Sequence, residues 1–64
     1  MFVQLNERVI LNLARITRIK IDEVEDGIRV RFYEGTQQVA KSRAFESVDL
    51  AKAWLKEVME NKAF

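Results

Sequence analysis

Apolar and charged residues alternate strictly along two neighbouring segments of this chain. Every second residue is apolar in Ile19-Lys20-Ile21 and again in Ile28-Arg29-Val30-Arg31-Phe32. Successive side chains of a strand point to opposite faces, so this period of two predicts an antiparallel sheet with one buried and one wet face. Between the two segments lies Glu25-Asp26-Gly27, a strong hairpin signal because glycine supplies the positive φ of a tight turn.

The remaining segments extend this pattern into a complete small fold. The expected strands are 1–5, 9–12, 16–24, 27–33 (or from 28) and 37–43, with a short turn over 12–15. Ser47 is suited to cap a helix that begins at Val48 and runs to about Asn61, with Phe45 anchoring the helix entry. One helical stripe should face the sheet; it consists of Val48, Ala51, Leu55, Val58 and Met59. The prediction is an α+β fold, an antiparallel sheet of four to five strands followed by one C-terminal helix packed on its apolar face.

The pairing of the fifth expected strand stays open between two registers. A two-residue turn at Glu34-Gly35 pairs Val30 with Val39, whereas a three-residue turn pairs Val30 with Ala40. The second register turns two small residues inward and two cations outward: Ala40 and Ser42, then Lys41 and Arg43. We favour it because small inward residues leave room for the helix, and because buried cations are costly.

The length of the chain argues for self-association. Its 64 residues make one domain (1–64), and a chain this short buries only about 60% of its unfolded surface. It has no cysteine and no histidine, although 48% of its residues are hydrophobic. One helix is about 10 Å wide, which covers roughly two strands at about 4.8 Å spacing. Part of a wider sheet needs another cover, so we expect a homodimer.

Residue types exclude most catalytic chemistry. Ser42 and Ser47 have no histidine to activate them, and no glycine-rich phosphate loop is present. The acidic run 22–26 is expected to be a solvated turn with ordinary pKa values and not a metal site. We therefore expect no enzyme, no cofactor and no metal. The net charge is +1, and there is no long apolar run or signal peptide pattern, so a cytoplasmic protein without a membrane partner is expected.

Two surfaces remain as candidate binding sites. The outward residues of the two alternating segments and their flanks are a candidate nucleic-acid surface: Arg18, Lys20, Arg29, Arg31 and Tyr33. Asp22 shares their face, so ordinary cross-strand ion pairs are the favoured interpretation. On the helix, two interpretations stay open for Leu50 and Trp54. In one they form an apolar strip for a protein partner. In the other Trp54 wraps onto the sheet edge and Leu50 is a scattered surface leucine. The leading hypothesis is a homodimeric interaction or accessory module, and the alternative is a nucleic-acid-binding module.

Overall fold

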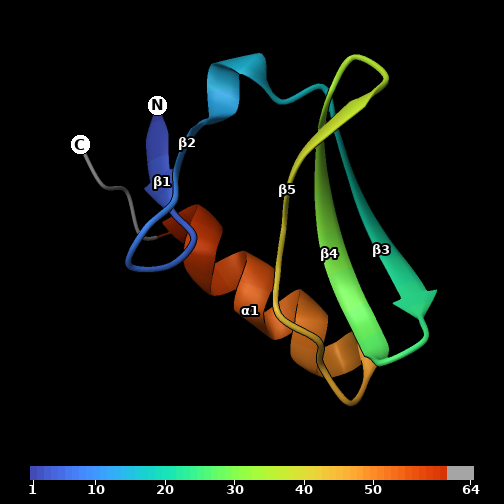
Figure 1. Cartoon of the computed structure of the whole chain (residues 1–64). Helices are drawn as coiled ribbons and strands as arrows, with labels where there is room; N and C mark the ends of the chain where they lie inside the picture. Colours follow the sequence, from blue (N-terminus) through green and yellow to red (C-terminus); the bar gives the residue numbers. More distant parts are fainter. Residues whose placement is uncertain (61–64) are drawn as a thin grey trace.

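The computed structural model describes residues 1–60, which form five strands, one 3-10 turn and one helix (Figure 1). The elements are β1 (Phe2–Gln4), β2 (Ile10–Asn12), η1 (Leu13–Arg15), β3 (Arg18–Val24), β4 (Gly27–Glu34), β5 (Gln37–Lys41) and α1 (Val48–Glu60). The fold is α+β, as predicted, and all strand pairs are antiparallel.

The expected single sheet is wrong, because the strands form two sheets. Among residues 1–60, β1 and β2 pair with each other, and β3, β4 and β5 make a separate three-stranded sheet. The chain leaves β2 at Asn12, whose side chain accepts a hydrogen bond from the Ala14 backbone and starts η1. The predicted short turn over 12–15 is thereby confirmed. It redirects the chain, so β3 begins in a different sheet.

A β-bulge sets the register of β5, and neither expected register is right. Tyr33 pairs with Gln38, as an ordinary two-residue turn at Gly35-Thr36 requires. Phe32 then pairs with Ala40, so Val39 is the extra residue of the bulge. Such a bulge changes which residues are opposite each other without changing the turn.

The predicted inward position of Ser42 is confirmed, and its hydroxyl continues the β4–β5 ladder. Ser42 is 5% exposed, and its Oγ accepts a hydrogen bond from the Val30 backbone at 2.9 Å while donating to the Arg43 carbonyl at 2.7 Å. The Ser42 backbone N–H donates to the Val30 carbonyl at 2.8 Å. Without the hydroxyl, the buried Val30 N–H would be unsatisfied, which costs about 1–3 kcal/mol.

The core lies between the three-stranded sheet, the β1–β2 hairpin and α1. The inward residues of β4 supply its centre, and Val30 and Phe32 are fully buried. Val3 of β1 and Leu5 pack into the same cluster. Figure 1 shows the hairpin on the left, the sheet on the right and α1 below. The chain's own hairpin therefore covers sheet surface for which a second subunit was expected.

The helix is capped as predicted, but its buried stripe is displaced. Ser47 Oγ accepts a hydrogen bond from the Leu50 backbone at 3.2 Å. Ala51 and Val58 are buried, whereas Val48 and Met59 are 43% and 38% exposed. The residues that face the core are spaced at i, i+3, i+4 and i+7: Ala51, Trp54, Leu55 and Val58.

The two ends of the helix differ in how well they agree with the prediction. Val48 and Met59 were expected in the stripe but lie outside it, because the stripe centres on the side that carries Trp54. The expected last helical residue, Asn61, lies outside the described residues. At the other end, Phe45 is 7% exposed and pairs with Ile28 in an isolated bridge, so its predicted role at the helix entry is confirmed.

Candidate interaction surfaces

The outward side of the three-stranded sheet gathers the predicted basic residues. Lys20 is opposite Arg31, which is opposite Lys41 on the third strand. Arg18 is opposite Tyr33 in the next row. Residues directly opposite on neighbouring strands share a face. We call this surface the basic face; it consists of Arg18, Lys20, Arg29, Arg31, Tyr33 and Lys41.

Two carboxylates on or beside the basic face form ion pairs with three of its cations. Asp22 lies 3.6 Å from Arg31 and 3.9 Å from Lys20. Asp26, in the turn between β3 and β4, lies 2.6 Å from Arg29. These are the cross-strand and local ion pairs that a solvated sheet face ordinarily carries.

The Asp26–Arg29 pair shifts both pKa values. Arg29 donates from Nη2 to Asp26 Oδ2 at 2.6 Å and from Nε to Oδ1 at 3.3 Å. These hydrogen bonds to the charged form lower the pKa of Asp26 below its ordinary 3.8 and raise the pKa of Arg29. The expectation of ordinary pKa values throughout the acidic run is therefore wrong for Asp26. Arg29 also donates to the Ser42 carbonyl at 2.6 Å, which fixes its guanidinium.

Tyr33 is the one aromatic residue of the basic face, and Arg18 already occupies its ring. The Arg18 guanidinium carbon lies 5.0 Å from the centre of the Tyr33 ring. This is a cation–π contact, and a nucleic-acid base would have to displace Arg18 to stack on that side of the ring.

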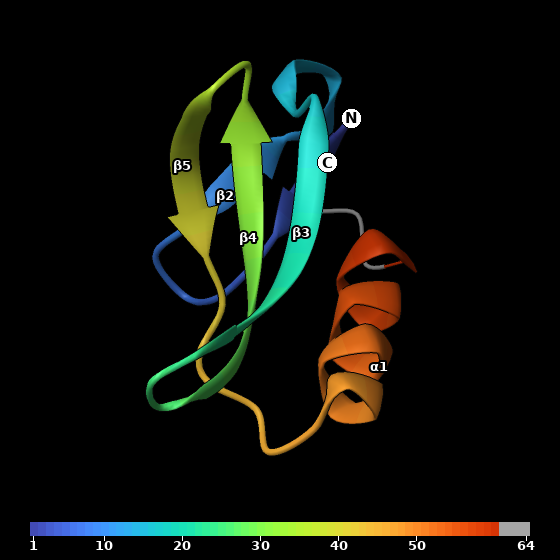
Figure 2. The same ribbon diagram turned by 90° about the vertical axis from the view of Figure 1, so that its right-hand side faces the viewer.

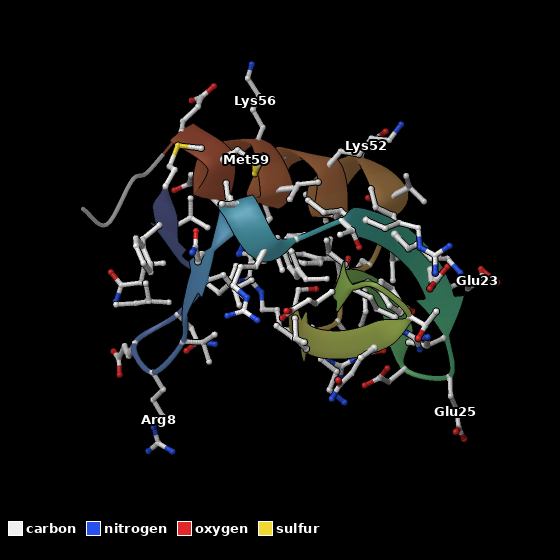
Figure 3. All side chains as sticks on the ribbon, turned by 90° about the horizontal axis from the view of Figure 1, so that it is seen from above. Arg8, Glu23, Glu25, Lys52, Lys56 and Met59 are labelled. Atoms are coloured by element: carbon white, nitrogen blue, oxygen red, sulfur yellow. The ribbon has the colours of Figure 1, made fainter. Side chains whose placement is uncertain are left out.

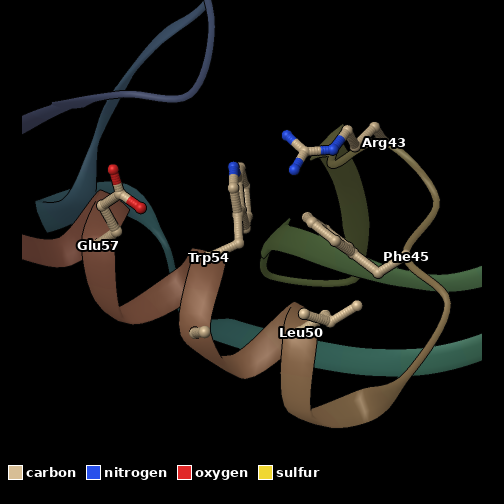
Figure 4. Close-up of a pocket in the computed structure, with 6 residues that line it drawn as sticks. Arg43, Phe45, Leu50, Trp54 and Glu57 are labelled. Atoms are coloured by element: carbon tan, nitrogen blue, oxygen red, sulfur yellow. The ribbon is translucent and has the colours of Figure 1, made fainter.

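A second surface lies on the flank of α1. A shallow pocket of about 250 Å³ opens there, lined by Arg43, Phe45, Leu50, Ala53, Trp54 and Glu57 (Figure 4). We call it the flank pocket. Leu50 at its rim is 51% exposed. The predicted pair Leu50 and Trp54 therefore lies in one site.

Trp54 is shared between this pocket and the core. Its ring centre lies 5.7 Å from that of Phe45 and 6.2 Å from that of Phe32, which it meets edge-on at 69°. Such aromatic pairs stabilise by about 0.5–1.5 kcal/mol beyond the area they bury. Trp54 therefore contacts the sheet at its central strand β4, and not at the sheet edge named in one of the two interpretations. Its remaining surface lines the pocket.

Arg43 belongs to the flank pocket and not to the basic face. Its guanidinium carbon lies 4.5 Å from the centre of the Phe45 ring, and Figure 4 shows it above that ring. The expectation that Arg43 joins the outward cations is wrong, because regular β5 pairing ends at Lys41. Lys41, by contrast, does join the basic face.

Of the residues that line the flank pocket, Leu50 and Trp54 were predicted from the sequence as a surface pair, and the others were not grouped with them. Leu50, Ala53, Trp54 and Glu57 lie at i, i+3, i+4 and i+7, so helical spacing alone groups them. Phe45 enters only through its bridge to Ile28, which no local pattern indicates.

Within residues 1–60, no group of three His, Cys, Asp or Glu side chains is placed to hold a metal ion. The described part of the chain contains no helix with the length and hydrophobicity to span a membrane. No protein-family model matches the sequence, and the searches of curated proteins and of solved structures return no match.

Proposed function

We propose that this protein is a small, non-enzymatic, cytoplasmic interaction module that acts as a homodimer. The observation that supports this best is the amount of apolar surface left in water. Seven large apolar residues of the described chain are 38–52% exposed: Met1, Phe2, Ile10, Val39, Val48, Leu50 and Met59. A chain of this size has little stability to spare, and self-association buries surface that its own core cannot.

Light scattering coupled to size-exclusion chromatography tests the dimer. At micromolar concentrations we expect twice the 7.5 kDa mass of a single chain. A mass of one chain at every concentration would contradict the proposal of self-association.

The flank pocket has the chemistry of a site for a protein partner. Its apolar lining of Phe45, Leu50 and Trp54 is bordered by Arg43 and Glu57. Interfaces commonly have this arrangement, with an aromatic centre and a charged rim, and tryptophan is enriched among the residues that dominate binding. The flank pocket therefore supports the proposal of a protein partner.

The alternative function is nucleic-acid binding by the basic face. It is supported by the row of Lys20, Arg31 and Lys41, which crosses all three strands of the sheet. Cations in such a row can contact successive phosphates, and phosphate contacts weaken steeply with added salt. The ion pairs with Asp22 and Asp26 reduce the charge available, so this function ranks second.

Fluorescence anisotropy with labelled single- and double-stranded oligonucleotides at two salt concentrations tests the alternative. If it holds, Lys20→Gln with Lys41→Gln abolishes binding at low salt. Lys52→Gln with Lys56→Gln is the matched control, because both lysines are exposed on α1 and point away from the sheet (Figure 3). Absence of binding by the unmodified protein at low salt rules this function out.

A further inference from the structure

β3 is an open edge of the three-stranded sheet. The order β3-β4-β5 gives β3 one strand neighbour within residues 1–60 (Figure 2). All seven of its residues pair with β4 in one unbroken register. The opposite edge, β5, is interrupted by the bulge at Val39. Bulges protect sheet edges from pairing with other chains, and β3 has no such protection.

The hydrogen bonds of β4 show which backbone groups of β3 face outward. Ile28 exchanges two hydrogen bonds with Phe45, at 2.9 and 2.7 Å, and the Val30 carbonyl accepts one from Ser42. These residues bond toward β5, so Arg29 and Arg31, which alternate with them, bond toward β3.

The same alternation continues into β3. Arg29 is opposite Asp22 and Arg31 is opposite Lys20, so Asp22 and Lys20 bond to β4. The residues between and beside them, Ile19, Ile21 and Glu23, direct their N–H and C=O groups to the open edge. These three alternate residues therefore have backbone groups available to pair with another strand.

Charge is distributed unevenly along this edge. The first half of β3 carries Arg18 and Lys20, and the second half carries Asp22 and Glu23. Antiparallel pairing of β3 with an identical strand brings the basic half of each copy against the acidic half of the other. The strand is thus electrostatically complementary to itself.

We propose that β3 pairs antiparallel with β3 of a second copy of this chain, with Ile21 opposite Ile21. This inference rests on the proposed self-association and locates its interface. The pairing joins two three-stranded sheets into one continuous sheet. It also places the two half-buried Ile21 side chains next to each other on the inner face.

The charges on β3 favour this register over the registers centred one or two residues away. Centring on Ile21 places Lys20 of each copy opposite Asp22 of the other. Centring on Lys20 or Asp22 places each of these charges opposite itself. Centring on Ile19 places Arg18 opposite Lys20, and centring on Glu23 places the two glutamates together. Both members of the favoured pair are accessible, since the side chains of Lys20 and Asp22 are 46% and 27% exposed.

A charge-exchange experiment tests the interface on the full chain. Lys20→Glu places two acidic residues opposite each other in both pairs, and Asp22→Lys does the same with two cations. Each variant alone is expected to elute as a monomer in light scattering coupled to size exclusion. Mixing the two variants restores opposite charges at both pairs, so a heterodimer of twice the single-chain mass is expected.

The outcomes separate this inference from the proposed function. If the unmodified protein and both variants are dimers, the β3 interface is wrong and self-association stands. If the unmodified protein is a monomer, both proposals fail. Circular dichroism of each variant monitors folding, because Asp22→Lys replaces the carboxylate that pairs with Arg31 and Lys20 by another cation.

A further variant tests the proposed interchain backbone hydrogen bonds without changing the charges at positions 20 and 22. Glu23→Pro removes one outward N–H, and Figure 3 shows Glu23 projecting from the molecule. An edge strand tolerates proline where the N–H faces outward. Two interchain bonds are lost by symmetry, so the dimer Kd should rise by about tenfold. Glu23→Gln, which keeps the N–H, is the control, and equal Kd values for these two variants would overturn the proposed pairing.

Discussion

At the scale of single residues, short polar contacts of Arg29 and Ser42 reinforce the junction between β4 and the segment that follows β5. Arg29 bonds to Asp26 in the turn before it and to the Ser42 carbonyl beyond β5. Ser42 in turn bonds to Val30 in the middle of the sheet. These contacts hold the end of β5 against β4 where regular pairing has stopped.

Because of the Asp26–Arg29 pair, we expect the stability of the fold to fall at acidic pH. The folded-state pKa of Asp26 lies below its ordinary value of 3.8, so the pair stabilises the fold at higher pH. That contribution is lost as pH falls through the lowered pKa. Carboxyl-detected NMR titration should give Asp26 a pKa below 3.8 in the unmodified protein and an ordinary value in Arg29→Gln. An unshifted Asp26 in the unmodified protein would contradict this account.

At the scale of elements, the two glycine turns have different physical requirements. Gly27 has φ +136°, and a Cβ there would lie 2.7 Å from the Phe45 carbonyl oxygen. Phe45 cannot easily move away because its backbone bonds to Ile28 in both directions. Gly35 has φ +63° and open space around it. The first turn therefore needs glycine for both conformation and close approach, and the second for conformation only.

Alanine substitutions at the two turns should separate these requirements. Gly35→Ala should lower the free energy of unfolding by about 1 kcal/mol, the cost of a left-handed residue. Gly27→Ala should lower it by about 3 kcal/mol, since backbone strain and steric overlap combine there. Urea denaturation of the two variants measures both values. Equal losses would show that the approach of Phe45 contributes nothing.

At the scale of the whole molecule, three elements close one small core. The described chain measures 31 × 25 × 18 Å, and the sheet, the β1–β2 hairpin and α1 all contribute buried residues to it. The large apolar residues that stay exposed lie in or beside the β1–β2 hairpin, on β5 and on α1. The proposed β3 pairing uses an edge of the sheet, because the hairpin already covers the inner face; it leaves these exposed residues to other contacts.

Much of the fold could be predicted from local patterns. The alternation around Val30 indicates the buried side of β4, and Asp26-Gly27 indicates the turn. The Ser47 cap was also predictable, because its hydrogen bond spans only three residues. The bulge at Val39 and the place of Arg43 were not predictable, because both depend on contacts between segments.

Local sequence patterns are enough to predict the element types, the turn positions and the face of each central strand that enters the core. These follow from side-chain periodicity and backbone preferences that act over a few residues. Three features became known only from the folded chain: the strands divide into two sheets, β5 is bulged, and Phe45 and Trp54 meet in a pocket. Such choices depend on the total energy of long-range packing. The alternating strands β3 and β4 are compatible with several arrangements of the chain. Packing of the hairpin, the helix and the sheet around one core stabilises one of these arrangements.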